Sequence, residues 1–437
     1  MNDKKQIFGW AMYDWANSAY VTTTVVAVLP AYFAAAIVPE EGFQIGGTML
    51  SATSLWGYMI SFSAFFVFLF APFLGAIADF SGLKKKFLVA FCYGGSLFAT
   101  LLYFCESGDV WLTIILFVLS QIGFVGGNIF YDSFLPQIAS EDKMDWVSGK
   151  GFAYGYIGGG IQFAISLGLI SMNESIGISA GEAARIAMAM SAIWWAGFSI
   201  FTFKYLKEEK TAEQLPKELK DKPKFIAFSI IGFKRVWLTT KKVKHFKHLL
   251  LYLIAFMIYN DGIQTVISMA TIYGKQELGL DTTVLMVTLL IIQFVSIGGA
   301  LLFGKIAGKI KTKFALMITL VLWSGVVVYA YFMTTAEEYF ALGVIVGICM
   351  GGSQSLSRSF YGSMIPQKAS AEFYGFYSVF NKFSAIWGPL VFALISQFTG
   401  SARLSIISLI VFFIVGLILL AFVDVEKAKE AKLSELF

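Results

Sequence analysis

Long apolar runs separated by short polar segments dominate the chain. A helix needs about 20 residues to cross a hydrocarbon core about 30 Å thick. When the runs are divided at charges, Pro and Gly, twelve candidate spans result. They cover residues 10–38, 50–78, 86–105, 110–138, 148–172, 184–205, 246–273, 283–306, 314–334, 339–365, 373–398 and 403–423. Because the strands of membrane barrels are short and alternate in polarity, these long runs predict an all-α integral membrane protein.

The composition supports a membrane protein and excludes several other classes. Hydrophobic residues make up 57% of the 437 residues and charged residues 14%, whereas soluble domains contain about 45–50% apolar and about 25% charged residues. A disordered chain and an ordinary soluble enzyme are therefore excluded. The three cysteines have no ligand spacing, and His245 and His248 have no acidic or cysteine neighbour. We therefore expect no disulfide framework, no metal site and no cofactor.

Charge alternates from one loop to the next. The odd-numbered loops carry ten acidic and three basic residues, while the even-numbered loops and both termini carry 28 of the 33 Lys and Arg residues. Since basic loops stay on the inner side of a membrane, this asymmetry predicts that both termini are cytoplasmic. The chain is therefore expected to be a multi-pass protein of the cell (inner or plasma) membrane.

The most basic segment lies between the sixth and seventh spans. Residues 204–247 contain thirteen Lys or Arg residues against five acidic ones. The segment divides the chain into a six-helix bundle (1–206), a basic cytoplasmic linker (207–245) and a second six-helix bundle (246–437). Aromatic and aliphatic residues alternate with lysines in the linker, as in a helix that lies on the inner headgroups. We expect this basic segment to contact the lipid bilayer and not nucleic acid.

The two halves of the chain contain similar segments. Residues 130–140 match residues 360–370 at an offset of 230, and residues 75–79 match residues 304–308 at an offset of 229. Two separate matches with nearly the same offset indicate a parallel internal repeat. Repeats of this kind are typical of secondary transporters, which place the substrate site between the two halves.

The loop after the second span carries the most specific motif of the sequence. Its residues are Gly75, Asp79, Gly82, Lys84, Lys85 and Lys86. Gly75 allows a neighbouring helix to approach, Gly82 provides a turn, and Asp79 is expected to pair across a closed gate. The motif resembles the signature loop of the major facilitator superfamily. This resemblance implies twelve helices in two pseudo-symmetric six-helix bundles, with helices 1, 4, 7 and 10 around a central cavity.

Three further segments carry a narrower resemblance. Residues 10–20, residues 131–136 and residues 259–265 are similar to the bacterial branch related to the yeast autophagy-linked vacuolar effluxers. The resemblance covers essentially the whole chain. The fungal relatives are regarded as exporters of amino acids from the vacuole, and this implies export of a small polar solute here.

Five charged residues lie inside the predicted spans: Asp14, Asp132, Asp261, Arg358 and Lys382. A charge near the centre of a bilayer costs about 2.5–3.5 kcal/mol on insertion scales, so these residues should face one another, a wet cavity or a substrate. With Asn17 and Gln264 they form the predicted substrate and ion site. Arg358 is expected to face Asp132 or Asp14, and the alternative is that such a pair is a purely structural latch.

Proton coupling requires a carboxylate that can titrate inside the membrane. Asp261 lies near mid-span and is the first choice for this role, with Asp132 as the second. Residues 299–306 nearly match the sequence motif of a phosphate-binding loop, but position 306 is Ile where the motif requires Ser or Thr. We therefore do not expect ATP to bind.

Together these features predict a secondary active transporter and not an enzyme. We expect a monomer that moves an amino acid or a similar zwitterion or anion by alternating access, in proton-coupled efflux. A lipid or cell-wall precursor flippase of the same fold is the alternative. A transporter-like receptor and an intramembrane enzyme are less favoured, since the sequence has neither Gly-x-Ser-x-Gly nor His-Glu-x-x-His.

Overall fold

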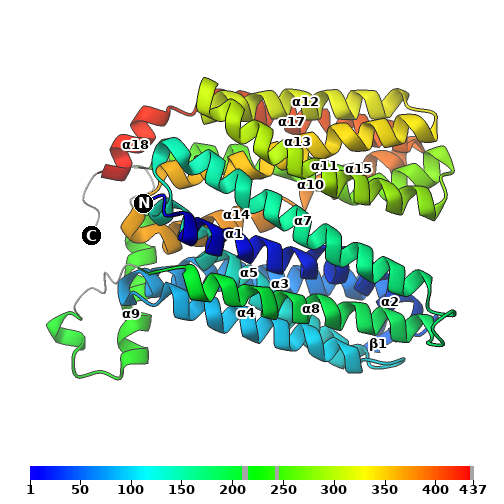
Figure 1. Cartoon of the computed structure of the whole chain (residues 1–437), viewed down its shortest axis with the longest axis horizontal. Helices are drawn as coiled ribbons and strands as arrows, with labels where there is room; N and C mark the ends of the chain where they lie inside the picture. Colours follow the sequence, from blue (N-terminus) through cyan, green and yellow to red (C-terminus); the bar gives the residue numbers. More distant parts are fainter. Residues whose placement is uncertain (209–214, 242–245, 434–437) are drawn as a thin grey trace.

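The computed structural model describes residues 1–208, 215–241 and 246–433. Within this part of the chain, twelve helical segments are long and apolar enough to cross a membrane, which confirms the predicted number. The helices run along a common direction, with the N-terminal bundle on one side and the C-terminal bundle on the other (Figure 1). The sequence-based fold class is therefore correct.

The helices of the first half follow the predicted spans closely. They are α1 (Lys4–Ala19) continued by η1 (Tyr20–Val28), α2 (Leu29–Tyr32) and η2 (Phe33–Ile37), then α3 (Ala52–Ser81), α4 (Lys84–Leu101) with η3 (Leu102–Phe104), α5 (Val110–Ser133) with α6 (Leu135–Ile138), η4 (Glu141–Lys143) with α7 (Met144–Ser171), and α8 (Ala180–Tyr205). A short antiparallel hairpin, β1 (Phe43–Ile45) and β2 (Thr48–Leu50), joins the first two spans.

The second half repeats this arrangement. Its helices are α10 (Lys247–Leu278), α11 (Thr282–Ile310), α12 (Thr312–Phe332), α13 (Ala336–Met364), η6 (Gln367–Ala369) with α14 (Ser370–Phe383) and α15 (Trp387–Thr399), and α16 (Ala402–Ser408) with α17 (Ile410–Ala421). η5 (Lys217–Leu219), α9 (Lys224–Lys241) and α18 (Val425–Leu433) lie outside the spans.

Local sequence explains where several helices begin and end. Thr335 and Glu338 form a capping box at the start of α13, with the Glu338 N–H donating to the Thr335 hydroxyl. Gly82 ends α3 in the left-handed region, with φ of 61°, which a residue without a side chain adopts at little cost. These stops produce the short turns that let consecutive spans run antiparallel.

Two spans are not regular α-helices, and the sequence did not predict either irregularity. The first span continues from Tyr20 as the π-helix η1, a form that occurs often at functional sites. The eleventh span is interrupted between Phe383 and Trp387, where α14 ends and α15 begins. Both stretches contact the other half, since Thr22 of η1 accepts a hydrogen bond from Gln293 and the ring of Phe383 packs on that of Phe68.

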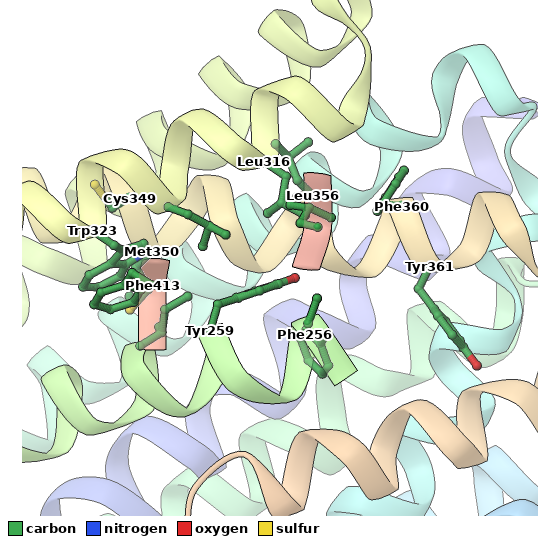
Figure 2. Close-up of a cluster of buried hydrophobic side chains, with 14 of the residues drawn as sticks. Phe256, Tyr259, Leu316, Trp323, Cys349, Met350, Leu356, Phe360, Tyr361 and Phe413 are labelled. Carbon is green, nitrogen blue, oxygen red and sulfur yellow. The ribbon is translucent and has the colours of Figure 1, made fainter. Parts of the chain in front are cut away.

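Packing in the second half is dominated by aromatic rings. Figure 2 shows part of this core, in which the rings of Trp323 and Phe413 stack at 5.9 Å while Phe256 and Tyr259 project from α10. Outward-facing apolar side chains are left bare, and Phe398 is 82% exposed. Such exposure would be a liability in water, but it is expected for the lipid face of a membrane protein.

Both the N-terminus and α18 lie at one end of the bundles, together with α9, and the hairpin β1–β2 lies at the other (Figure 1). We name these the terminal end and the hairpin end. Helix α9 runs crosswise to the spans, as a headgroup helix would. Its Gly232 packs on Ile77 and Phe73 of α3, while an outer stripe of apolar side chains stays exposed. The stripe consists of Ile226, Ile230, Phe233 and Trp237.

Part of the predicted linker cannot be compared with the structure, because residues 209–214 and 242–245 lie outside the described residues. His245 is one of them. His248 lies in α10, where its Nδ1 atom accepts a hydrogen bond from the Asp424 N–H at 3.2 Å. Within the described residues, no group of three or more His, Cys, Asp or Glu side chains is arranged to hold a metal ion.

Candidate functional site

A cavity of about 480 Å³ lies between the two halves. Helices α1, α5, α10 and α13 contribute to its wall, as the family resemblance implied, and η1, α7 and α11 also take part. Aromatic side chains such as Phe124, Phe256 and Tyr377 cover much of it. Among the described residues that line it, three are charged: Asp14, Asp132 and Arg358. Two acids and one base give this wall an excess of negative charge.

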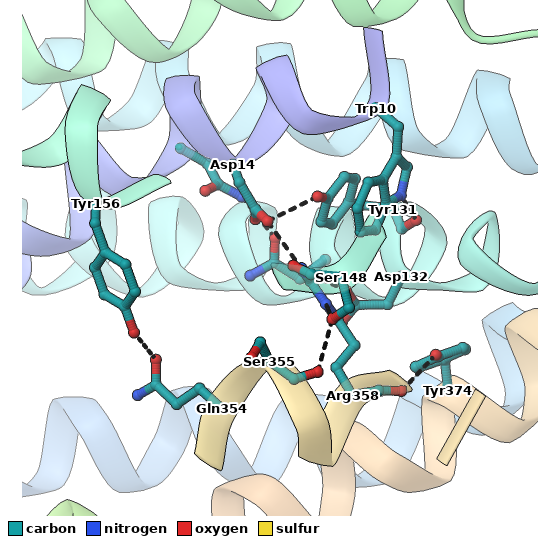
Figure 3. A network of polar contacts seen from close by, with 12 residues as sticks. Trp10, Asp14, Tyr131, Asp132, Ser148, Tyr156, Gln354, Ser355, Arg358 and Tyr374 are labelled. Carbon is teal, nitrogen blue, oxygen red and sulfur yellow. Dashed lines mark hydrogen bonds and ion pairs between the residues drawn. The ribbon is translucent and has the colours of Figure 1, made fainter. Parts of the chain in front are cut away.

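Arg358 projects from the second half into the first (Figure 3). Its Nη1 atom lies 3.0 Å from Asp14 Oδ2 and 3.2 Å from Asp132 Oδ1. The Nε and Nη2 atoms donate to the hydroxyl and the carbonyl oxygen of Ser148, at 3.1 Å and 3.0 Å. One guanidinium thus joins α13 to α1, α5 and α7 and closes the cavity on the side of the terminal end.

Three aromatic rings surround the same guanidinium. The Arg358 Cζ atom lies 4.1 Å from the ring centre of Phe152, 4.7 Å from that of Trp10 and 5.5 Å from that of Tyr131. The Tyr131 hydroxyl also donates to Asp14 Oδ2 at 2.8 Å. A cation over an aromatic face is attracted by the ring quadrupole, most strongly where water is excluded. We call the set Trp10, Asp14, Tyr131, Asp132 and Phe152 the Arg358 cage.

The cage depends on a glycine in α7. A Cβ atom added at Gly151 would lie 2.7 Å from Trp10 and 2.8 Å from both Arg358 Nη2 and Asp14 Oδ2. These separations are shorter than carbon atoms tolerate, so a larger residue here would displace the guanidinium or the ring. Gly151 therefore makes room for the charge of Arg358 and for the ring of Trp10.

The signature loop forms a second connection between the halves, at the terminal end. Asp79 Oδ1 lies 2.6 Å from Lys84 Nζ, and the carboxylate accepts the backbone N–H groups of Ala371 and Glu372 at 3.2 Å and 2.8 Å. These N–H groups belong to the first turn of α14, which favours a negative charge. Gly75 is needed as well, since a Cβ atom there would overlap the Ala371 carbonyl group.

The remaining motif residues hold the loop in place. Lys84 Nζ donates to Ser370 Oγ at 2.9 Å, and Lys85 Nζ donates to the Leu206 carbonyl oxygen at 2.8 Å. The Glu208 carboxylate accepts the N–H groups that begin α4. Burial raises the pKa of the Glu208 carboxyl, although these hydrogen bonds favour its charged form. Lys86 is exposed.

Asp261 has a different position from the one its place in the sequence suggested. It is buried but is not among the described residues that line the cavity. Its two carboxylate oxygens accept the N–H groups of Trp387 and Gly388 at 3.0 Å and 2.8 Å. The break in the eleventh span leaves these N–H groups without a helical partner, and Asp261 satisfies them.

The other predicted site residues divide between the cavity and its surroundings. Asn17 lines the cavity and donates to Asn128 Oδ1 at 2.8 Å, and Gln264 also lines it. Lys382 is half-buried and is not among the described residues of the cavity wall. The structure therefore brings together Asp14, Asn17, Asp132, Gln264 and Arg358, and leaves Asp261 and Lys382 outside this group.

Several contacts across the cavity involve neutral residues that sequence reasoning did not select. The Tyr156 hydroxyl donates to Gln354 Oε1 at 2.7 Å, and Gln293 Nε2 donates to Thr22 Oγ1 at 3.1 Å. Each pair joins the first half to the second. A neutral side chain adds little to the cost of membrane insertion, so the charge argument could not find these pairs. Two aromatic members of the cage had a signal, because Trp10 lies close in sequence to Asp14 and Tyr131 is next to Asp132, whereas Phe152 had none.

Comparison with known proteins gives consistent results. A family model described as "Vacuole effluxer Atg22 like" matches residues 2–433. An uncharacterized MFS-type transporter, YxiO of Bacillus subtilis, is 36% identical over 428 residues, which cover 98% of this chain and 96% of that protein. Autophagy-related protein 22-1 of Aspergillus niger is 26% identical over 317 residues, which cover 69% of this chain and 51% of that protein. The chain thus spans about half the length of this fungal relative.

Solved structures agree on the fold. The human organic anion transporter MFSD10 (TETRAN) has a TM-score of 0.68 at 12% identity and covers 95% of this chain and 99% of its own. The transporter FucP in its outward conformation has a TM-score of 0.68 at 11% identity and covers 96% of this chain and 98% of its own. Both proteins are transporters, and FucP belongs to the major facilitator superfamily. At these identities the likeness is one of fold.

Proposed function

The chain belongs to the Atg22-like family of vacuole effluxers, and from this premise we propose that it exports a small zwitterion, such as an amino acid, in exchange for protons. As an MFS-type transporter it is a secondary transporter and not an enzyme. The observation that carries the proposal is the charged cluster of Asp14, Asp132 and Arg358 in the wall of a cavity between two repeated halves.

The cavity has the chemistry that a zwitterion needs. Asp14 and Asp132 suit the ammonium group of a zwitterion, because hydrogen bonds between an ammonium group and a carboxylate are strengthened by charge. The aromatic wall suits an apolar side chain. Alternating access would then follow from separation of the two halves at the terminal end and their approach at the hairpin end.

For the coupling proton, the geometry favours Asp132 over Asp261. The two oxygens of Asp261 already accept backbone N–H groups, which stabilise the ionised form. Asp132 instead shares one guanidinium with Asp14. When Arg358 moves away, Asp132 loses its only ion-pair partner among the described residues, whereas Asp261 keeps its two N–H donors. Asp132 is therefore the carboxylate that gains more from binding a proton.

The sidedness is also a proposal. We infer that the terminal end faces the cytoplasm of a monomer in the plasma membrane, because the basic loops gather there, and that α9 lies on the inner headgroups. A cysteine at the exposed Lys143 should then react with a membrane-impermeant thiol reagent in inside-out vesicles and not in intact cells. The opposite labelling pattern would reverse the assignment.

A lipid or cell-wall precursor flippase is the second candidate, and the apolar wall of the cavity favours it. Such a substrate has long chains that must remain in the bilayer, so the cavity would have to open sideways during transport. Competition separates the candidates, since a precursor lipid should then inhibit and amino acids should not.

The direct test is transport into proteoliposomes that contain the purified chain. A panel of radiolabelled amino acids is offered under an imposed proton gradient, with gradient-free vesicles as the control. We expect uptake of at least one amino acid to depend on the gradient, and the Asp132→Asn variant to lose this dependence while it still inserts. Uptake that is equal with and without the gradient would exclude proton coupling.

A further inference from the structure

We propose that the Arg358 cage is an organic-cation site that Arg358 itself occupies in the observed conformation. The inference rests on the proposed function and names the group of the substrate that is recognised. When the terminal end opens, an ammonium or guanidinium group of the substrate takes the place that Arg358 leaves, while the carboxylate of the substrate is dispensable.

The origin of the residues provides the first argument. The carboxylates and the three rings of the cage all belong to the first half, on α1, α5 and α7, whereas Arg358 belongs to α13 of the second half. Arg358 also lies toward the end of α13 that is nearest the terminal end. Separation of the halves at that end therefore withdraws the cation and leaves the cage intact.

Charge balance provides the second argument. With Arg358 in place, one guanidinium faces the two carboxylates of the cage, and its Nη1 atom lies 3.0 Å from Asp14 Oδ2 and 3.2 Å from Asp132 Oδ1. Without it, two carboxylates would remain side by side within the membrane, where unpaired charge is strongly disfavoured. Opening of the terminal end therefore requires that another positive charge enter the cage.

The rings indicate which positive charge enters. A proton bound to Asp132 or Asp14 would replace the positive charge of Arg358 but would make no use of Trp10, Tyr131 and Phe152. Aromatic faces attract organic cations, and rings assembled around a cation are a recurring means of binding ammonium groups. Access is available, because Asp14, Tyr131, Asp132 and Phe152 also line the cavity.

In this arrangement Arg358 competes with the substrate and does not bind it. The apparent affinity for a cation is then reduced by the fraction of molecules in which Arg358 fills the cage. Removal of Arg358 should therefore strengthen cation binding. If Arg358 instead held the carboxylate of the substrate, its removal should weaken the binding of every ligand that carries a carboxylate.

Binding of three ligands of similar shape to the full-length chain tests the proposal. The probes are 2-phenylethylamine, 3-phenylpropionate and phenylalanine, measured by calorimetry on the purified protein. We expect 2-phenylethylamine to bind the Arg358→Ala variant at least about tenfold more tightly than the unaltered chain. The Asp14→Asn variant should lose this binding, and 3-phenylpropionate should bind neither protein. Arg358→Lys, which keeps a cation in the cage, is the matched control and should show no gain.

A conformational measurement covers the case in which Arg358→Ala folds poorly. Spin labels at Lys143 in the first half and Lys368 in the second, both exposed at the terminal end, report its opening in the unaltered chain. We expect 2-phenylethylamine to lengthen the distance between the labels and 3-phenylpropionate to leave it unchanged.

Three results would overturn the proposal: tighter binding of 3-phenylpropionate than of 2-phenylethylamine, loss of cation binding in Arg358→Ala, and opening by protons with no effect of the amine. These results are separate from a failure of the proposed export. A chain that binds 2-phenylethylamine in the cage but moves no amino acid in proteoliposomes would refute the export proposal and leave the cation site standing.

Discussion

Two charged clusters join the halves of this transporter, and they differ in balance. At the terminal end, Asp79 faces Lys84 and two N–H groups of α14, so one acid meets one base. Beside the cavity, Arg358 meets both Asp14 and Asp132. The Asp79 carboxylate has a basic partner of its own, whereas the cavity cluster has one carboxylate more than it has basic groups. The terminal cluster is therefore suited to stabilising one conformation, and the cavity cluster is suited to binding a cation.

The two clusters also differ in what happens when they separate. Asp79 and Lys84 lie in the same half and remain paired when α14 moves away. Arg358 and its two aspartates lie in opposite halves and lose each other. The cost of opening is therefore concentrated in the cavity cluster, where a bound cation can offset it.

The largest effect is expected from the removal of Arg358, which would leave the cavity cluster without its positive charge and the terminal cluster unchanged. Arg358→Ala leaves two buried carboxylates without a partner, and breaking a buried ion pair costs about 3–5 kcal/mol of the free energy of unfolding. Thermal denaturation in detergent measures the loss. Adding Asp132→Asn should restore part of it, because one of the two unpaired charges disappears. An Arg358→Ala variant as stable as the unaltered chain would show that the Arg358 ion pairs do not contribute to the free energy of unfolding.

Substitution of Gly151 should weaken the same cluster by a steric route. In Gly151→Ala the new Cβ atom meets Arg358 Nη2 and Trp10, and such overpacking costs about 1–3 kcal/mol. We expect the terminal end to open more readily, with a longer distance between labels at Lys143 and Lys368. Gly168→Ala in the same helix is the control, because nothing lies within 4 Å of a Cβ atom there. Equal behaviour of the two variants would mean that the space at Gly151 is not needed.

Sequence reasoning succeeded where the burial of a charge or the exposure of apolar surface to water has a large cost in free energy. The twelve spans followed from runs of apolar residues, and the two-bundle fold from the internal repeat and the resemblance of the loop after the second span. Asp14, Asp132 and Arg358, which the structure brings together, were selected as site candidates because an isolated charge in a membrane is costly. The partners of Arg358 among neutral aromatic residues, such as Phe152, gave no comparable signal.

The sequence could not predict the break in the eleventh span either. Gly388 and Pro389 follow the break and are compatible with a helix start, but a Gly-Pro pair within an apolar run equally fits a continuous, kinked span. Tertiary contacts stabilise the break. Asp261 accepts the N–H groups that the break frees, and Asn260 donates to Asn381 Oδ1 at 2.9 Å. A carboxylate that looked like a candidate proton carrier from its mid-span position is, in the structure, the cap of α15.

The smallest effect is expected at Asp261, and it distinguishes a cap from a coupling residue. Asp261 resembles Asp79 in accepting two N–H groups at a helix start, but no basic partner within ion-pair distance is found for it in the described chain. In Asp261→Asn the amide oxygen accepts only one of the two N–H groups, so the loss is one hydrogen bond, about 0.5–1.5 kcal/mol, and the interaction of a charge with the helix dipole, about 0.3–1 kcal/mol. Gradient-driven transport should therefore persist at more than about half of its normal rate, while Asp132→Asn abolishes the gradient dependence. If Asp261→Asn instead abolishes it and Asp132→Asn does not, the proton is carried by Asp261, and the cap is part of the coupling machinery.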